Sequence, residues 1–238
     1  RGGVSQLDGW TMPEMLRDGE VGLVVNLPSL PTELGEENRG ERISGHGKAI
    51  QEIEDFFEAA QHYAQVKSLS DDADALVSKR DVQLEAMVPY VEGTAPVLFR
   101  ADSYKKIQEA LQFAEEYGLK AVIVGGQDAW KCASELAEKD VPVIITSVFA
   151  TPGTYDPYDA AYANAGKLEA AGVRFCIAVS GASNVKQLPS YLGMAVAHGL
   201  SEDAAVRSAT LDAARILGIE EVTGSLEVGK VADVIITT

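Results

Sequence analysis

Residues 95–126 read APVLFRADSYKKIQEALQFAEEYGLKAVIVGG, and this stretch decides the fold class. Residues 95–99 form an apolar run that predicts a strand, and apolar side chains then recur at helical spacing through residues 103–117. Gly118 is the residue type that most often ends a helix. Residues 119–124 are a second apolar run and predict another strand. A strand, a helix and a strand joined by short connections indicate two neighbouring parallel strands.

The same alternation continues downstream of this stretch. Residues 128–139 predict a helix, residues 141–147 a strand, and residues 173–179 a further strand. A loop rich in Tyr, Pro and Asp, residues 151–159, leads into a helix that ends at Ala171. Short, continuous Val and Ile runs are typical of strands buried on both faces. The sequence therefore predicts an α/β fold with a parallel sheet or barrel.

The N-terminal part is less regular. Residues 20–27 (EVGLVVNL) predict one more strand, and residues 50–65 predict a long amphipathic helix. Between them, residues 28–47 are rich in Gly, Pro and Glu and are predicted to form a loop or insertion. A second helix is expected at about residues 73–91, so that residues 28–93 form a loop and helical insertion before the next strand.

The C-terminal part changes character. Helices are predicted at about residues 189–198 and 201–217, followed by a turn at residues 224–230 (GSLEVGK). A final apolar run, residues 232–237, predicts a strand with no helix after it. Such a strand must pair with something other than the parallel sheet.

Composition narrows the function classes. The chain has 238 residues with 20 Lys and Arg against 36 Asp and Glu, a net charge of −16. This acidic balance does not favour nucleic-acid binding, which needs a basic face. No apolar run approaches the roughly 18 to 20 residues that cross a bilayer, so we expect a soluble chain without a membrane span. Cys132 lies in a predicted helix and Cys176 in a predicted strand, which favours two buried thiols over a disulfide.

Several segments resemble the C-terminal part of the amidohydrolase superfamily, in its imidazolonepropionase-like branch. The most specific is residues 209–237, ATLDAARILGIEEVTGSLEVGKVADVIIT, and residues 199–210, 96–126 and 171–189 resemble the last strand and helix pairs. Residues 7–28 carry a weaker likeness.

The resemblance implies a TIM-type (β/α)8 barrel of metal-dependent hydrolases that is incomplete in this chain. Residues 1–221 would supply about strands four to eight, and residues 222–238 would begin a small β-sandwich. A missing N-terminal segment or another chain would have to complete the barrel, because a partial barrel exposes strand edges. The resemblance to this branch also slightly favours an exported, periplasmic location.

The superfamily holds its metal with a His-x-His after the first strand, a His after the fifth, a His after the sixth and an Asp after the eighth. This sequence has Arg100, Gly125 and Ser180 or Gly181 at the last three positions. A guanidinium stays protonated and glycine has no side-chain donor, so neither binds a cation. We therefore expect no metal ligand in this segment, and Zn²⁺ or a similar ion only if the missing N-terminal half supplies the ligands.

The three histidines do not replace these ligands. His46 is predicted in the Gly-rich loop, His62 on a helix and His198 near a helix end, so none follows a barrel strand. We expect structural or surface roles for His62 and His198, while His46 remains the least certain.

Polar residues that follow the predicted strands are the candidates for a pocket that binds a small polar ligand. They are Arg100, Asp102, Gln127, Asp128, Ser147, Ser180 and Asn184. Asp102 or Ser103, and likewise Asp128, have an alternative role as helix N-caps.

Two further features of the strand ends bear on the pocket. Arg100 needs an anionic partner, either Asp102 or a ligand. Tyr155, Tyr158 and Tyr162 either cover the pocket or pack, and we favour packing.

Two functions from different classes follow. One is a hydrolase of C–N bonds in small cyclic amides, dipeptides or related compounds, with a degenerate metal site. The alternative is a catalytically inactive barrel, a pseudoenzyme, that serves as a ligand-binding or structural subunit of an assembly. The resemblance favours the hydrolase, whereas Arg100, Gly125 and Ser180 favour loss of the usual chemistry.

Overall fold

The computed structural model describes residues 2–5, 16–28, 39–69, 81–231 and 234. The chain divides into two compact units. The first contains Arg1–Phe99 and Glu109–Ala121, and the second contains Arg100–Gln108 and Val122–Thr238. Among the described helices, none combines the length and the apolar character needed to cross a membrane.

The strands of the first unit lie side by side in chain order. Strand β1 (Gly2–Ser5) pairs antiparallel with β2 (Leu16–Val25), and the register shifts along the pair. Strand β2 then pairs parallel with β3 (Val97–Ala101), with Leu23 beside Val97 and Val25 beside Phe99. The strand predicted at residues 20–27 is confirmed, although it begins earlier than the apolar pattern indicates.

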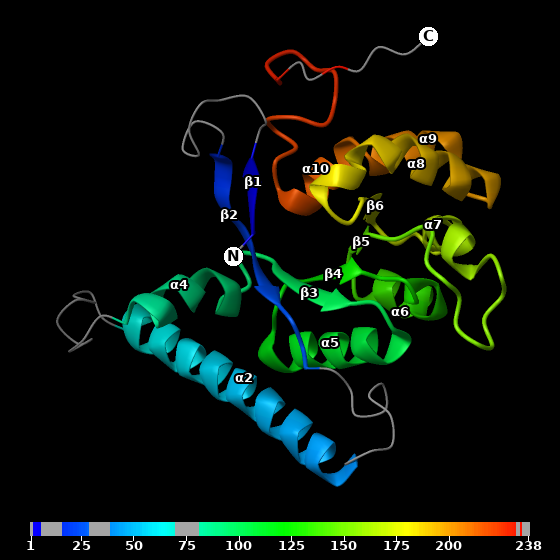
Figure 1. Cartoon of the computed structure of the whole chain (residues 1–238). Helices are drawn as coiled ribbons and strands as arrows, with labels where there is room; N and C mark the ends of the chain where they lie inside the picture. Colours follow the sequence, from blue (N-terminus) through cyan, green and yellow to red (C-terminus); the bar gives the residue numbers. More distant parts are fainter. Residues whose placement is uncertain (1, 6–15, 29–38, 70–80, 232–233, 235–238) are drawn as a thin grey trace. The chain divides into compact units, whose positions relative to one another are not determined.

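Helix α2 (Arg39–Ser68) packs against α4 (Val82–Val91) in the first unit (Figure 1). The loop predicted at residues 28–47 is wrong for residues 39–47, which belong to α2, while residues 29–38 lie outside the described chain. Gly40, Gly45 and Gly47 each disfavour a helix by about 1 kcal/mol. Extension of the adjoining amphipathic helix, in which each added residue gains a backbone hydrogen bond, offsets that cost.

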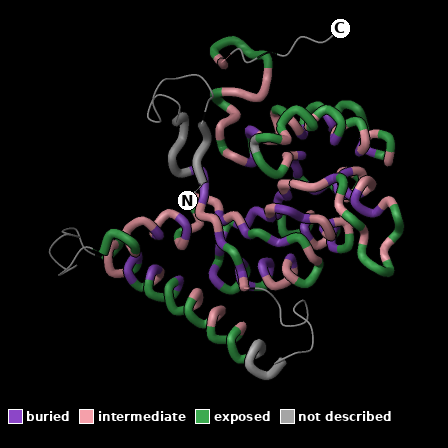
Figure 2. The backbone as a smooth tube through the Cα atoms, in the orientation of Figure 1, coloured by how far each residue is buried: buried purple, intermediate pink, exposed green. Residues whose placement is uncertain are grey.

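The contact between α2 and α4 combines apolar and polar pairs. The buried residues of α2 fall along one side of the helix (Figure 2). Tyr63 donates a hydrogen bond to Glu85 at 2.8 Å, and Lys67 forms an ion pair with the same carboxylate.

Asp81 caps α4 by accepting hydrogen bonds from the backbone N–H groups of Gln83 and Leu84. The predicted helix at residues 73–91 is therefore found as α4, and residues 73–80 lie outside the described chain.

An aromatic cluster forms the core of the first unit. The ring of Phe113 lies 5.3 Å from that of Phe57, 6.0 Å from that of Phe99 and 4.7 Å from that of Tyr117, between ring centroids. The edge-to-face geometry of Phe57 on Phe113 is favourable for aromatic pairs. Burial, helped by nearby acidic side chains of α2, raises the pKa of Tyr117. These rings join α2, β3 and α5 (Tyr104–Tyr117).

The second unit contains the parallel strands that the sequence predicts most clearly. Strand β4 (Ala121–Gly125) pairs with β5 (Val143–Ile145), and β5 pairs with β6 (Phe175–Ile177), all parallel and in chain order. Almost every residue of these strands is buried, as expected for strands covered on both faces. The predicted alternation of strands and helices is therefore confirmed in this unit.

Helices follow each of these strands. They are η2 (Ala129–Cys132), α6 (Ala133–Glu138), α7 (Ala160–Ala170), η3 (Ala182–Gln187), α8 (Leu188–Ala197), α9 (Glu202–Ser208) and α10 (Leu211–Leu217). The single helix predicted at residues 201–217 is wrong, because it breaks at Thr210. The Thr210 hydroxyl donates to the Val206 carbonyl at 2.8 Å, a local hydrogen bond of the kind that competes with helix continuation.

The remaining predictions for this unit concern the thiols and the C-terminus. Cys132 and Cys176 are free and buried, as predicted, and burial raises their pKa values to about 11 and about 12. Residues 224–230 form turns and bends, as predicted. Of the strand predicted at residues 232–237, only Val234 lies within the described chain.

Phe57 is predicted to carry much of the stability of the first unit. Replacement by Ala removes a ring that is 2% exposed, so the free energy of unfolding should fall by about 3 to 5 kcal/mol. The neighbouring Phe56, which is 38% exposed, is a matched control, and Phe56→Ala should cost under about 1 kcal/mol. Urea unfolding followed by circular dichroism measures both, and equal losses would contradict the assigned core.

Candidate functional site

The carboxyl ends of the strands in the second unit meet at one edge. The backbone N–H of Gly126 donates to the Ala101 carbonyl at 2.9 Å, and that of Thr146 donates to the Gly125 carbonyl at 3.3 Å. The N–H of Ala178 donates to the Ile145 carbonyl at 2.8 Å. We call residues 100–103, 125–128, 146–148 and 178–181 the strand-end face. Parallel α/β folds place their chemistry at such ends.

Asp102 and Gly125 are in close contact on this face. Gly125 has φ of +109°, a backbone conformation that side chains rarely adopt. A Cβ atom added to Gly125 would lie 2.9 Å from Cγ of Asp102 and closer still to its Oδ1. The Asp102 carboxyl group therefore occupies the space that a side chain at position 125 would need. A side-chain ligand at position 125 would strain the backbone and displace the Asp102 carboxyl group.

The surroundings of the Asp102 carboxyl group shift its pKa upwards. Burial raises the pKa of this carboxyl, the cation of Lys106 opposes the shift, and the negative charge of Asp128 adds to it. A carboxyl group with a raised pKa at a strand end is a candidate for proton transfer.

Arg100 is the last but one residue of β3 and is exposed. Within the described residues it forms no ion pair, and the carboxyl group of Asp102, its predicted partner, contacts Gly125 instead. An exposed guanidinium with five N–H donors is suited to bind a carboxylate.

Asp128 ties two strand ends together. Its Oδ2 accepts a hydrogen bond at 3.0 Å from the backbone N–H of Tyr104, the first residue of α5, and its Oδ1 lies 3.0 Å from Lys131 Nζ. The sequence predicts that Asp128 caps the helix that follows it, and this is wrong, because its side chain makes no hydrogen bond to the start of η2. The side chain instead accepts a hydrogen bond at the start of α5. Ser103 provides the backbone carbonyl that begins α5, accepting from Ile107 N–H at 3.0 Å.

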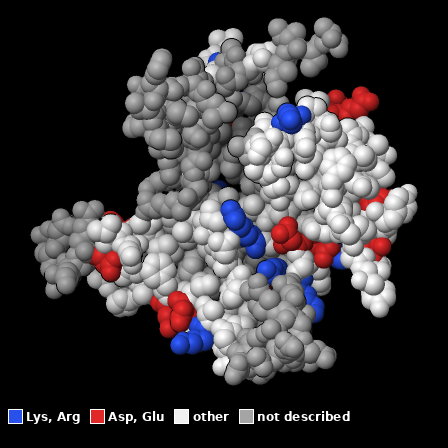
Figure 3. Space-filling model, viewed as in Figure 1, with Lys and Arg blue, Asp and Glu red and all other residues white. Residues whose placement is uncertain are grey.

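Lys131 extends this network to the loop between β5 and α7. Its Nζ lies 2.8 Å from Asp156 Oδ2, which also accepts from the Gly153 N–H at 3.2 Å. Burial opposes the charge of Lys131, but the hydrogen bonds to Asp156 and Asp128 raise its pKa above the ordinary value. The hydrogen bond to Lys131 lowers the pKa of Asp156. Figure 3 shows Lys and Arg in blue and Asp and Glu in red, and both kinds lie on the face in view.

A second contact fixes the same loop. Gln127 Nε2 donates to the Thr151 carbonyl at 2.9 Å, so this candidate pocket residue serves to hold the loop.

Asn164 is buried beneath the strand-end face, and the sequence interpretation missed it. Its Nδ2 donates to the Gly126 carbonyl at 2.9 Å, and its Oδ1 accepts from the Trp130 N–H at 3.0 Å. Both groups of the amide are used, as a buried side chain requires. Asn164 therefore supports the turn that carries Gln127 and Asp128. Its place at helical spacing among buried Ala161, Ala165 and Leu168 is a signal that could have found it.

The other candidates are less connected. Ser147 follows β5 and is half-buried. Ser180 follows β6 and is exposed, and its backbone carbonyl accepts from Asn184 Nδ2 at 2.9 Å. In the part of the chain that the structure describes, Ser180 and Asn184 form no hydrogen bond with Arg100, Asp102, Gln127, Asp128 or Ser147.

His46, His62 and His198 belong to helices or helix ends and not to the residues that follow the strands. His46 is on α2 and not in a loop, and its Nε2 is 3.1 Å from Glu109 Oε1, within the first unit. His62 is exposed on α2. His198 caps the end of α8 and packs on the ring of Tyr162 at 4.9 Å between centroids. The surface or structural roles predicted for His62 and His198 agree with these positions.

The strand ends do not fit a metal ion. Over the described residues, no three His, Cys, Asp or Glu side chains lie close enough together to hold one. Asp102 is a single carboxyl group beside a glycine, and Arg100 carries a positive charge. No step of a reaction is therefore assigned to a metal held by these residues.

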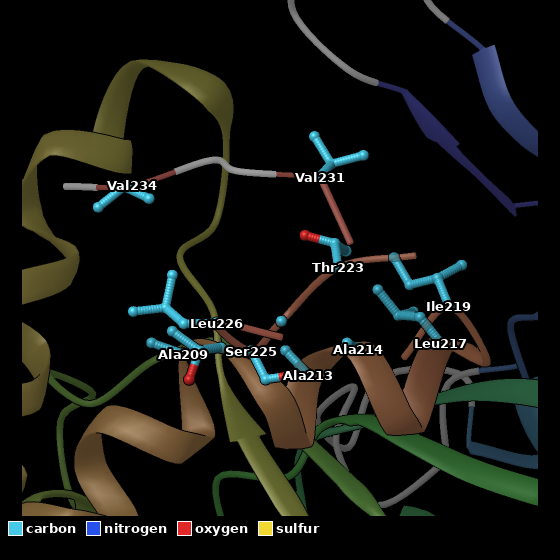
Figure 4. Close-up of a pocket in the computed structure, with 12 residues that line it drawn as sticks. Ala209, Ala213, Ala214, Leu217, Ile219, Thr223, Ser225, Leu226, Val231 and Val234 are labelled. Atoms are coloured by element: carbon cyan, nitrogen blue, oxygen red, sulfur yellow. The ribbon is translucent and has the colours of Figure 1, made fainter. Parts of the chain in front are cut away.

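Two hollows lie elsewhere. One of about 590 Å³ is lined in the second unit by α10 and the segment after it, including Leu217, Ile219, Leu226 and Val231 (Figure 4). The other, about 390 Å³, lies in the first unit beside β2. Neither is lined by a candidate pocket residue, and the first has no ionisable side chain among its lining residues.

Comparison with known proteins gives two informative matches. The sequence model of the amidohydrolase family matches residues 159–238. The fold is similar to the crystal structure of an amidohydrolase from Thermotoga maritima MSB8, with 24% identity and a TM-score of 0.82. That match covers 98% of this chain and 61% of the Thermotoga protein, so this chain spans less than two thirds of its length. No curated protein matches the sequence.

Two weaker likenesses have TM-scores below 0.5. A prolidase complexed with N-methylphosphonate-L-proline has 21% identity and a TM-score of 0.46, over 65% of this chain and 41% of that one. An adenosine deaminase from Xanthomonas campestris with bound zinc has 22% identity and a TM-score of 0.44, over 73% and 39%. The Thermotoga match confirms the predicted barrel-type α/β fold, with the barrel incomplete over the residues compared.

Gly125→Ala is predicted to be strongly destabilising. The positive φ and the contact with Asp102 should together lower the free energy of unfolding by about 2 kcal/mol or more. Gly193, which is exposed within α8 and has open space around it, is the matched control. Gly193→Ala should leave stability unchanged or raise it by up to about 1 kcal/mol. Thermal unfolding tests both.

Asp102→Ala separates the two causes. In the double variant Asp102→Ala/Gly125→Ala, the free energy of unfolding should recover the part that Gly125→Ala loses through the clash with the carboxyl group. No recovery would contradict the contact between Asp102 and position 125.

Proposed function

We propose that this chain is a member of the amidohydrolase superfamily and that it forms the substrate-binding side of a barrel that hydrolyses C–N bonds. The proposed substrates are small cyclic amides, dipeptides or related compounds that carry a carboxylate. The observation that carries the proposal is the position of Arg100 and Asp102 on the strand-end face, next to a glycine that has no side chain.

The two side chains have different proposed roles. Arg100 binds the substrate carboxylate through its guanidinium N–H groups, because no ion pair within the described residues occupies it. Asp102 accepts a proton from the attacking water and returns it to the leaving nitrogen. Its raised pKa makes both transfers more nearly balanced than an ordinary Asp would. Any divalent metal would have to be held by residues other than those at positions 100, 125 and 180.

The alternative is a barrel that binds the same ligands without hydrolysing them. The specific observation in its favour is the backbone of Gly125, whose φ of +109° denies a side-chain ligand to the end of β4. If only the residue type at position 125 differed, a single substitution could restore the His. This backbone, however, cannot accept a His without strain.

Steady-state kinetics of the full-length protein on N-acyl amino acids, dipeptides and cyclic amides tests the two functions. Asp102→Asn should lower kcat by about a hundredfold or more. Arg100→Gln should raise KM by about tenfold for substrates with a carboxylate. In the wild type, kcat should fall as the pH drops through the pKa of Asp102, and this fall should begin at a higher pH than for an ordinary Asp.

Arg174→Gln is the matched control for these variants, because Arg174 pairs with Asp140 at 3.0 Å and lies before β6, at the opposite end of the strand. It should leave both constants unchanged. Binding without turnover would favour the non-catalytic barrel, and turnover that ignores both Arg100 and Asp102 would contradict the proposed site.

Further polypeptide is proposed to complete the barrel at the edge of β2. Among the described residues, Leu23–Val25 pair with β3 on one side and with no strand on the other. The hollow of about 390 Å³ lies beside these residues and is walled by Ile53, Phe56, Phe57 and Met87. An open strand edge beside an apolar hollow suits an added strand.

A photo-crosslinking amino acid at position 56 tests this pairing in the purified full-length protein. We expect crosslinks to an apolar, extended segment outside residues 1–238, identified by mass spectrometry. Position 62, exposed on the same helix, is the control and should not give that product. Crosslinks confined to residues 1–238 of the same chain would contradict the pairing. The expected exported location is a separate proposal, which cell fractionation would test.

A further inference from the structure

The loop between β5 and α7 carries two exposed aromatic side chains. Tyr155 is 99% exposed and Tyr158 is 81% exposed. The sequence favours packing for these rings, and that prediction is wrong for both. It is correct for Tyr162, whose ring lies 5.8 Å from that of Phe149 and 4.9 Å from that of His198. Tyr155 and Tyr158 therefore contribute almost no buried area to the folded unit.

The backbone that presents the two rings is held in place. Asp156, between them, binds Lys131 at 2.8 Å and accepts from Gly153 N–H at 3.2 Å. Thr151 accepts from Gln127 at 2.9 Å. A loop fixed at these points loses little backbone freedom when a ligand binds, so the backbone that carries the two rings is preorganised.

The loop lies at the same end of the sheet as the strand-end face. Lys131 also binds Asp128 at 3.0 Å, and Asp128 accepts from the backbone N–H of Tyr104, two residues after Asp102. Within the second unit, Figure 1 shows the loop before α7 on the side towards which the β4 strand points. A continuous set of polar contacts thus links the loop, through Asp156, Lys131 and Asp128, to the backbone of Tyr104.

We propose that Tyr155 and Tyr158 bind the aromatic or bulky apolar side group of the substrate, while Arg100 binds its carboxylate. The proposal rests on the proposed function and adds the substrate class: amides of aromatic or large apolar amino acids. A tyrosine ring offers an apolar face for stacking and a hydroxyl that stays in water, so it can remain exposed in the free protein. Asp156, which lies between the two tyrosines in sequence, is neutralised by Lys131, so the charge of this carboxylate does not oppose an apolar ligand.

Isothermal titration of the full-length protein with two probes of equal charge tests this proposal. The probes are N-acetyl-L-phenylalanine and N-acetylglycine. We expect the wild type to bind the first more tightly, by about tenfold, and Tyr155→Ser and Tyr158→Ser each to reduce the preference by about threefold. Tyr→Phe at either position should retain it. The melting temperature should not change in any of these variants, since the rings are exposed.

Arg100→Gln distinguishes a failure of this proposal from a failure of the proposed function. Equal weakening of both probes by Arg100→Gln, together with no preference in the wild type, would overturn the tyrosine proposal alone. A preference that depends on the tyrosines but not on Arg100 would overturn the carboxylate site alone. If neither probe binds to the folded protein, the result contradicts both the tyrosine proposal and the carboxylate site. A change in oligomeric state on removing the tyrosines, with ligand preference unaltered, would make the loop a protein-docking surface instead.

Discussion

The contact between the Asp102 carboxyl group and Gly125 constrains what the ends of β3 and β4 can present. Because the carboxyl group fills the space of a side chain at position 125, and because φ there is +109°, a metal ligand at the end of β4 would strain the backbone and displace Asp102. The end of β3 presents Arg100, a cation, at the position where the sequence resemblance implies a His. The site that results is a carboxyl group with a raised pKa and a guanidinium free of ion pairs among the described residues.

Asn164, Asp128 and Lys131 support the residues of the strand-end face. Asn164 satisfies the Gly126 carbonyl from below, and Asp128 joins the start of α5 to Lys131. Lys131 in turn holds Asp156 and with it the loop that exposes Tyr155 and Tyr158. Such supporting contacts fix side chains more tightly than loops alone would. They are consistent with a face kept for binding, whether or not hydrolysis follows.

Much of the fold is predictable from the sequence, because buried parallel strands leave continuous Val and Ile runs and helices leave a 3.6-residue period. The start of α2 at Arg39 and the break at Thr210 were not predicted, because tertiary contacts and local hydrogen bonds overrode the composition. The candidate residues at the strand ends were predictable from their place after each strand. The contacts among these residues were not predictable, because nothing in the sequence shows that Asp102 contacts Gly125 or that Asp128 caps α5.

The most direct test of the central claim is a crystal structure of the full-length protein grown with excess Zn²⁺, with anomalous scattering measured at the zinc edge. We predict that the Asp102 carboxyl group lies against Gly125, with no anomalous peak within bonding distance of residues 100, 102, 125 or 180. Zinc bound elsewhere by other residues would agree with this account. A zinc peak coordinated by Asp102, with Gly125 moved out of its positive-φ conformation, would contradict it.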